Sequence, residues 1–314
     1  MNICVIGGDL RTAELIKMLA KDENDSNVIK YANNKNSANN SEVQVNKNQL
    51  FLYGLEKCDT LTNSKGETNF NHIDNLEKGL QNCDFVITSI PLSKDGKYIN
   101  ANFTDKKISV QDFFNTVKNK KIITGNITNE IQSIIKPENN NEIIDVLKYE
   151  ELTILNSIPT AEGAIQIAME KSQITLHNSN CLVLGFGRIG KILAKMLQGF
   201  GANVYCEARK PHDIAWIKAY GYNPIMLDDL NENLSKFDFI FNTIPYVILD
   251  KNNLNLIQKE CIIIDLASKP GGVDFDEANR LGLKTDWALA LPGKVAPKTS
   301  AKYIYDIIEK LEIK

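Results

Sequence analysis

Histidine is scarce in this chain, which has three histidines among its 314 residues. His72 and His212 lie in polar or helix-start surroundings and His177 lies in a loop before an apolar run, so we expect all three to be structural or exposed. The six cysteines form no CxxC pair and no Cys/His spacing that suits zinc. We therefore predict no metal site and no Ser/His/Asp catalytic set.

A strong charge of one sign and a long apolar run are also absent. The 36 basic and 39 acidic residues give a net charge of −3, which provides no overall field that would attract nucleic acid or anionic lipid. No apolar run approaches the roughly 18 residues that a membrane span needs, and residues 1–8 carry no basic segment typical of a signal peptide. We expect a cytoplasmic protein with no nucleic-acid partner and no membrane partner.

What the chain does contain is a regular alternation of short apolar runs and helical periods. This pattern predicts an α/β fold of two Rossmann-like doubly wound parallel-sheet domains with an interdomain cleft. We place a substrate-side domain at residues 1–150 and a cofactor-binding domain with a C-terminal helix at residues 151–314. The Asn-rich stretch at residues 22–48 lacks periodicity and is interpreted as a surface insertion in the first domain.

Two strand ends resemble each other across the halves of the chain. Residues 83–91 and residues 237–245 each contain an apolar strand that ends in a hydroxyl residue, Ile and Pro. Ligands of open α/β sheets bind beyond the carboxyl ends of strands, so we predict that Ser89 contacts substrate and that Thr243, Ile244 and Pro245 contact cofactor. The alternative is that each proline simply ends its strand.

The most informative motif is a GxGxxG sequence that follows an apolar strand and opens an amphipathic helix. In this context the first glycine permits a tight turn, the second lets the backbone approach a pyrophosphate, and the third lets the helix pack on the strand. The helix N-terminus adds amide donors and a partial positive charge. We predict that a dinucleotide binds at Gly185-Phe186-Gly187-Arg188-Ile189-Gly190.

The end of the next predicted strand, residues 203–207, indicates which dinucleotide is bound. The position where an NAD site has a carboxylate for the ribose is Ala208, and Arg209 and Lys210 follow it. These cations suit an adenosine 2′-phosphate, so NADP is predicted and NAD is less favoured. Glu207 is one residue early, and strand alternation should direct it to the other face.

Several cations and helix starts predict an anionic, polycarboxylate ligand. The turn at Gly8 and Arg11 suits a small carboxylate, although Asp9 could cap the helix and leave Arg11 solvated. Lys269 follows a strand with Ser268 before it, and Lys298 precedes the last helix. Thr160 suits the N-cap of a helix beginning near it, and Glu162 lies in the first turn of that helix; capping alone could explain both residues.

Together these motifs resemble those of a known family, the A subunit of dipicolinate synthase from spore-forming bacteria. The resemblance covers the chain apart from residues 22–48 and rests on Ile6-Gly7-Gly8-Asp9-x-Arg11, Asn156-Ser157-Ile158-Pro159-Thr160-x-Glu162-Gly163, the GxGxxG motif, Asp265-Leu266-Ala267-Ser268-x-Pro270-Gly271-Gly272 and Leu291-Pro292-Gly293-x-Val295-Ala296-Pro297-Lys298-Thr299. It implies oxidation of a CH–CH bond in dihydrodipicolinate with a nicotinamide acceptor. It also implies work with the B subunit of dipicolinate synthase in the mother cell of a sporulating bacterium.

On this interpretation the substrate is a small dicarboxylate. We assign Glu162 as the base that removes a proton and Lys269 as a catalytic cation, with cofactor contacts extending to Ser268. We assign substrate binding to Gly8, Arg11, Ser89, Thr160 and Lys298.

Two other functions remain open at this point. A D-2-hydroxyacid dehydrogenase shares the two-domain layout, but those enzymes have a catalytic histidine after the last strand, where this chain has Pro292-Gly293. The second alternative is a non-catalytic NADP-binding scaffold whose partner carries the chemistry. Assaying the purified chain by itself for NADP reduction with dihydrodipicolinate separates an enzyme from a scaffold.

Overall fold

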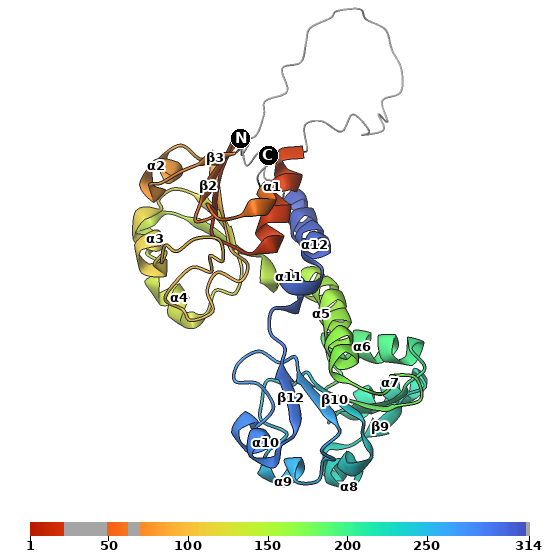
Figure 1. The fold of residues 1–314 in the computed structure, drawn as a ribbon. Coiled ribbons are helices and arrows are strands. Elements are labelled where there is room, and N and C mark those ends of the chain that lie inside the picture. Colours follow the sequence, from red (N-terminus) through yellow and green to blue (C-terminus); the bar gives the residue numbers. More distant parts are fainter. Residues whose placement is uncertain (22–48, 62–69, 312–314) are drawn as a thin grey trace, which may run out of the picture. The chain divides into compact units, whose positions relative to one another are not determined.

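The computed structural model describes residues 1–21, 49–61 and 70–311. The predicted insertion at residues 22–48 lies outside the described residues. The chain divides into two compact domains (Figure 1). The first comprises Met1–Leu152 together with Pro297–Lys314, and the second comprises Thr153–Ala296.

The first domain is built on a six-stranded sheet in which all paired strands are parallel, in the order β3-β2-β1-β4-β5-β6. The strands are β1 Asn2–Ile6, β2 Gln49–Tyr53, β3 Asn71–His72, β4 Phe85–Thr88, β5 Lys121–Thr124 and β6 Glu142–Asp145. Its helices are α1 Leu10–Lys21, α2 Leu76–Gln81, α3 Val110–Thr116, α4 Asn129–Ile134 and α12 Pro297–Lys310.

The second domain has a sheet of the same kind, with the order β12-β11-β10-β7-β8-β9 and parallel pairing throughout. The strands are β7 Asn180–Leu184, β8 Asn203–Glu207, β9 Asn223–Ile225, β10 Phe239–Asn242, β11 Ile262–Asp265 and β12 Lys284–Trp287. Its helices are α6 Arg188–Gly199, α7 Pro211–Ala219, α8 Leu230–Asn233, α9 Lys251–Leu254, α10 Phe275–Leu281 and α11 Leu291–Val295.

Both sheets have the doubly wound order in which the first strand lies beside the second and the fourth. The predicted pair of Rossmann-like domains is thereby confirmed. The start and end of α7 also follow the sequence: Pro211 is its first residue, and Gly221 follows the C-cap with φ +80°.

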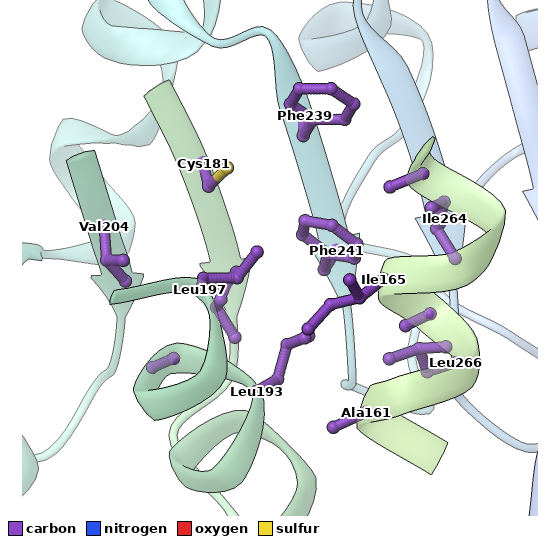
Figure 2. Packing of buried hydrophobic residues seen from close by; sticks show 14 of the residues in the cluster. Ala161, Ile165, Cys181, Leu193, Leu197, Val204, Phe239, Phe241, Ile264 and Leu266 are labelled. Carbon is purple, nitrogen blue, oxygen red and sulfur yellow. The ribbon is translucent and has the colours of Figure 1, made fainter. Parts of the chain in front are cut away.

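One face of the second sheet is covered by α6 and by the later turns of α5, which runs from Glu150 to Lys171. Small and aliphatic side chains of both helices pack against alternate residues of the strands, as expected for a strand buried on both faces. Figure 2 shows this cluster, which includes Ala161, Ile165, Leu193, Leu197, Cys181, Val204, Phe239, Phe241, Ile264 and Leu266.

The helix expected to begin near Thr160 begins ten residues earlier, and that part of the prediction is wrong. Pro159 lies inside α5 instead of ahead of it. The hydroxyl of Thr160 donates to the carbonyl of Asn156 at 2.8 Å, and the hydroxyl of Ser157 donates to Thr153 at 2.9 Å. These residues therefore bond back along the helix, as serine and threonine do within helices, and Thr160 is not an N-cap.

The terminal helix α12 was expected in the second domain and lies in the first, where it packs against α1. Its apolar face joins the same buried cluster as the apolar face of α1; the residues are Leu15, Ile16 and Leu19 of α1 and Ala301, Ile304, Ile307 and Ile308 of α12. The amphipathic period predicts that such a helix is buried on one face, but it does not specify the partner.

Candidate functional site

A row of polar residues marks the carboxyl edge of the second sheet. Parallel pairing puts Glu207, Leu184, Asn242 and Asp265 in register at the ends of β8, β7, β10 and β11. Glu207 is 1% exposed, and Asn242 and Asp265 are fully buried. Buried polar groups at strand ends need hydrogen-bond partners, and the loops that follow the strands bond to each of these three side chains.

The glycine motif lies in the middle of this edge, and its three glycines have different surroundings. Gly185 has φ +89°, and a Cβ there would lie 2.7 Å from Thr243 Oγ1. A Cβ on Gly190 would lie 2.1 Å from the carbonyl oxygen of Gly185, so helix α6 can approach the strand only without a side chain. Apart from Gly187 itself, its chain neighbours and the adjoining helix backbone, no described atom lies within 4 Å of the Cβ position of Gly187. The turn is therefore open where a pyrophosphate would approach.

The other residues of the motif anchor the turn. Phe186 is buried and lies 6.4 Å, ring to ring, from Tyr220 and from Tyr222. Arg188 is exposed and donates through Nη1 to Thr153 Oγ1 at 2.8 Å. Ile189 packs partly buried on the core. The part of this turn that is open to a ligand is therefore the backbone at Gly187.

Two buried side chains hold the loops beside the glycine turn. Asp265 accepts hydrogen bonds from the amides of Ala267 at 3.0 Å and Gly272 at 2.7 Å. The Asn242 amide donates to Asp265 Oδ1 at 2.8 Å and to the carbonyl of Ile244 at 3.0 Å. A Cβ on Gly272 would lie 2.7 Å from that Ile244 carbonyl, so the two loops lie against each other.

Asn242 and Asp265 were missed as a structural pair by the sequence analysis. The signal was a single polar residue at the end of each of two otherwise apolar strands, Phe239–Asn242 and Ile262–Asp265. The loops that they hold carry predicted cofactor residues. Thr243 donates to the carbonyl of Leu184 at 2.8 Å, Ile244 is half-buried, and Pro245, Ser268 and Lys269 are exposed.

The end of β8 differs from expectation. Glu207 connects the strand to the glycine turn, because its Oε2 accepts the amide of Gly185 at 3.2 Å. The residue that strand alternation was expected to direct to the other face therefore contacts the motif itself, since its register partner Leu184 directly precedes Gly185. Ala208 is buried, and Arg209 and Lys210 are exposed after it.

The glycine turn of the first domain is closed by the chain itself. Gly8 donates its amide to Asn100 at 2.7 Å and accepts through its carbonyl from Asn102 at 2.9 Å. Ser89 donates its hydroxyl to the carbonyls of Pro91 and Leu92, at 3.0 and 2.9 Å. We name residues 92–109 the edge-covering segment, because they supply most of these partners.

Arg11 is buried and not solvated. Its side chain binds both carboxylate oxygens of Asp9, with Nη2 2.7 Å from Oδ2, and Asp9 also caps α1 by accepting the amide of Arg11 at 2.9 Å. The predicted substrate role of this residue stays a prediction, as do those of Gly8, Ser89 and Thr160, whose hydrogen-bonding groups all have partners within the chain. Lys298 and Glu162 are exposed.

The residues that the structure describes contain no group of three or more His, Cys, Asp and Glu side chains that could hold a metal ion. None of their helices has the length and apolar character that crossing a membrane requires.

Family models match both domains. The model of the N-terminal domain of the dipicolinate synthase A subunit matches residues 43–147. The model of the NAD-binding domain of D-isomer specific 2-hydroxyacid dehydrogenases matches residues 159–272, which include the GxGxxG motif. A nicotinamide cofactor and an oxidoreductase role are supported by this second match.

Individual proteins extend the similarity. A glyoxylate reductase of Thermococcus gammatolerans is 31% identical over 112 residues, covering 33% of this chain and 31% of the reductase. The solved structure of the dipicolinate synthase A subunit from Bacillus halodurans has a TM-score of 0.81 and 26% identity, covering 100% of this chain and 98% of that one. The dipicolinate synthase A subunit of Bacillus subtilis is 29% identical over 99% of this chain and 95% of its own length. The resemblance predicted from the motifs is thus confirmed: along its whole length, this chain is similar to the A subunit of dipicolinate synthase.

Proposed function

We propose that this chain oxidises dihydrodipicolinate to dipicolinate with NADP as the hydride acceptor. The observation that carries the proposal is the similarity to the dipicolinate synthase A subunit over the full chain, combined with an open dinucleotide turn at Gly187. We further propose that it acts with the B subunit of that enzyme, in the mother cell of a sporulating bacterium, as the resemblance implies.

The residues present fit a nicotinamide dinucleotide. The Gly187 backbone and the N-terminus of α6 would hold the pyrophosphate, with Thr243 and Ile244 beside the turn. Arg209 and Lys210 are exposed after β8, where the adenosine ribose is expected, and would bind a 2′-phosphate. When bound, the cofactor supplies the acceptor for a hydride.

The reaction removes a hydride and a proton from the dihydropyridine ring, and the ring becomes aromatic. The hydride passes with its electron pair to the acceptor, and the proton passes to a base, so each turnover gives one dipicolinate, one NADPH and one proton. Orientation is then the main requirement on the protein. We assign Glu162 as the proton acceptor and Lys269 as the cation that binds a substrate carboxylate; both are exposed in the second domain.

The first test is an assay of the purified chain with dihydrodipicolinate and NADP, following NADPH by absorbance and dipicolinate by chromatography. Equimolar products in the absence of the B subunit support the proposal. Binding of NADP by this chain alone, with dipicolinate formed only when the B subunit is present, would favour the scaffold alternative. Reduction of glyoxylate with no dipicolinate formed would favour a 2-hydroxyacid dehydrogenase, the class to which the match over residues 159–272 points.

The assigned residues are tested by substitution. Lys269→Ala should raise KM for substrate roughly ten- to hundred-fold through loss of one charge-assisted contact, with the Kd for NADP unchanged. Glu162→Gln should lower kcat and leave KM in place. Arg209→Ala should weaken NADP and spare NAD. Lys259→Ala is the matched control, because Lys259 is exposed and precedes β11 at the opposite edge of the sheet. Wild-type kinetics in the first two variants would overturn these assignments.

A further inference from the structure

The carboxyl group of Glu207 is buried at the dinucleotide turn with half of its hydrogen-bonding capacity unused. The residue is 1% exposed, and its Oε2 accepts the Gly185 amide at 3.2 Å. Its Oε1 is buried and accepts no hydrogen bond from any residue that the structure describes. An ionised carboxylate in such a place is costly, because burial removes water without supplying partners for both oxygens.

The neighbours of Glu207 offer little compensation for a negative charge. Its register partners, Leu184 on β7 and Ile225 on β9, are buried and apolar. Tyr205 lies two residues earlier on the same face of β8 and is contacted by the ammonium group of Lys236, which lies 4.2 Å from the ring centre. Arg209 is the charged residue that acts on Glu207, and it is exposed. Burial raises the pKa of the Glu207 carboxyl above its ordinary value, and the Gly185 amide and Arg209 oppose that rise.

The position matters because Glu207 ends β8, two residues before Arg209. The adenosine ribose of a dinucleotide is expected after this strand. The two cations that would bind a 2′-phosphate therefore lie two and three residues after an acid that can be neutral or charged. When Glu207 is neutral, the positive charges of Arg209 and Lys210 attract the phosphate without opposition. When Glu207 is a carboxylate, it repels the phosphate and also attracts Arg209.

We propose that Glu207 is a selectivity residue for the cofactor: with its proton it permits binding of the 2′-phosphate of NADP, and on losing the proton it disfavours NADP relative to NAD. The inference rests on the proposed function, since it requires a nicotinamide dinucleotide at the Gly185–Gly190 turn. The effect acts through charge and needs no contact between Glu207 and the ligand.

The size of the effect follows from Coulomb's law. Two unit charges separated by about 10 Å at an effective dielectric constant near 20 change an affinity roughly tenfold. The 2′-phosphate itself titrates near pH 6, and its second ionisation strengthens binding to Arg209 and Lys210 as the pH rises. Ionisation of Glu207 has the opposite sign, so a variant that cannot ionise separates the two contributions.

The experiment measures Kd for NADP and for NAD between pH 5.5 and 9, in wild type and in Glu207→Gln. Glutamine keeps the volume and an acceptor for the Gly185 amide. Glu232→Gln, at an exposed position on α8, is the control for loss of one acidic residue elsewhere in the domain. Glu207→Ala is measured in parallel, so that a folding defect in one variant does not decide the result.

We expect the NADP-to-NAD affinity ratio of wild type to fall roughly tenfold relative to Glu207→Gln as the pH rises. The Glu232→Gln curve should follow wild type, and the Glu207→Ala curve should follow Glu207→Gln. If the NADP-to-NAD affinity ratio changes with pH in the same way in wild type and both Glu207 variants, while both cofactors bind, the inference is overturned and the proposed function stays intact. Selective loss of NAD in Glu207→Gln at every pH would overturn it by identifying Glu207 as an acceptor for ribose hydroxyls. Failure of wild type to bind either cofactor would refute the proposed function and the inference with it.

Discussion

The two domains have the same strand order and yet differ at the edge where a doubly wound sheet binds its ligand. In the first domain the edge-covering segment pairs with Gly8 on both sides of its backbone, and Leu92 donates to Gly125 at 2.7 Å. In the second domain the equivalent turn is open at Gly187. A shared topology therefore leaves the two turns in different surroundings. The chain itself bonds to both sides of the Gly8 backbone, whereas it leaves the space beside Gly187 open.

A second comparison concerns the aspartates that organise the loops at each edge. Asp145 accepts the amides of Asn126, Ile127 and Leu147 at 2.9, 2.9 and 3.0 Å. Asp265 accepts two loop amides and the Asn242 side chain. Asp145 is 8% exposed and Asp265 is 0% exposed. At both edges a buried aspartate thus accepts hydrogen bonds from loop amides, and the aspartate of the open edge is the more deeply buried.

The largest effect on stability should come from removing these aspartates. Asp265→Ala leaves three buried donors without an acceptor, which should lower the free energy of unfolding by about 3–5 kcal/mol. Asp145→Ala should cost about half as much, because water can reach the donors that it leaves. Urea denaturation monitored by circular dichroism measures both. An equal loss in the two variants would show that the difference in burial has no energetic consequence.

The next effect separates the structural glycines of the open edge from the functional one. Gly190→Ala should cost about 1–3 kcal/mol of stability, because its Cβ would lie 2.1 Å from the Gly185 carbonyl oxygen. Gly187→Ala should leave the melting temperature unchanged and weaken dinucleotide binding. Thermal denaturation and cofactor titration of each variant test this division; a stability loss in Gly187→Ala would contradict it.

Gly8, in the turn of the closed edge, should respond in the opposite way to Gly187. Gly8 has φ +123°, and a Cβ there would lie 2.0 Å from Thr12 Oγ1. Gly8→Ala should therefore destabilise the protein by about 1–3 kcal/mol while the Kd for the dinucleotide stays at its wild-type value. If Gly8→Ala instead weakened dinucleotide binding in a folded protein, the assignment of the dinucleotide to the open edge alone would be wrong.

The smallest effect concerns the pH dependence of stability. The carboxyl of Glu207 titrates near pH 4.3 when unfolded, and burial raises its pKa in the folded protein. The folded state then holds the proton more tightly, so wild type should lose stability relative to Glu207→Gln as the pH rises from the unfolded pKa to the folded pKa. The loss should be about 1.4 kcal/mol for each pH unit between those two values. Melting temperatures of both proteins from pH 4 to 8 provide the measurement, and a constant difference between them would contradict the expectation.

Much of the fold could be predicted because its signals are local. The glycine motif after a strand, and the placement of Pro211 and Gly221 around α7, depend on backbone conformations that few residues adopt. The partner of α12 could not be predicted, since an amphipathic face fits any apolar surface of similar shape. The course of α5 through Pro159 was also missed, because proline is normally a sign that a helix ends.

The site was predicted less completely for a related reason. A sequence shows which groups could bind a ligand but not which of them the chain already uses. Arg11 is a free cation by composition, and only the structure reveals its pairing with Asp9. Glu207 was assigned to the far face from strand alternation alone. Its contact with Gly185 follows from the register between β7 and β8, which is a long-range property.

The division of the first domain between the two ends of the chain has a consequence for biosynthesis. Its N-terminal part is translated before the cofactor domain, but helix α12, which shares a buried cluster with Leu15, Ile16 and Leu19, is translated after it. The whole of the cofactor domain, Thr153–Ala296, is translated in between. A nascent chain can therefore complete the second domain while the first still exposes the apolar face of α1. Translation that stops before Pro297 would release a folded cofactor domain attached to an N-terminal domain whose core is not closed.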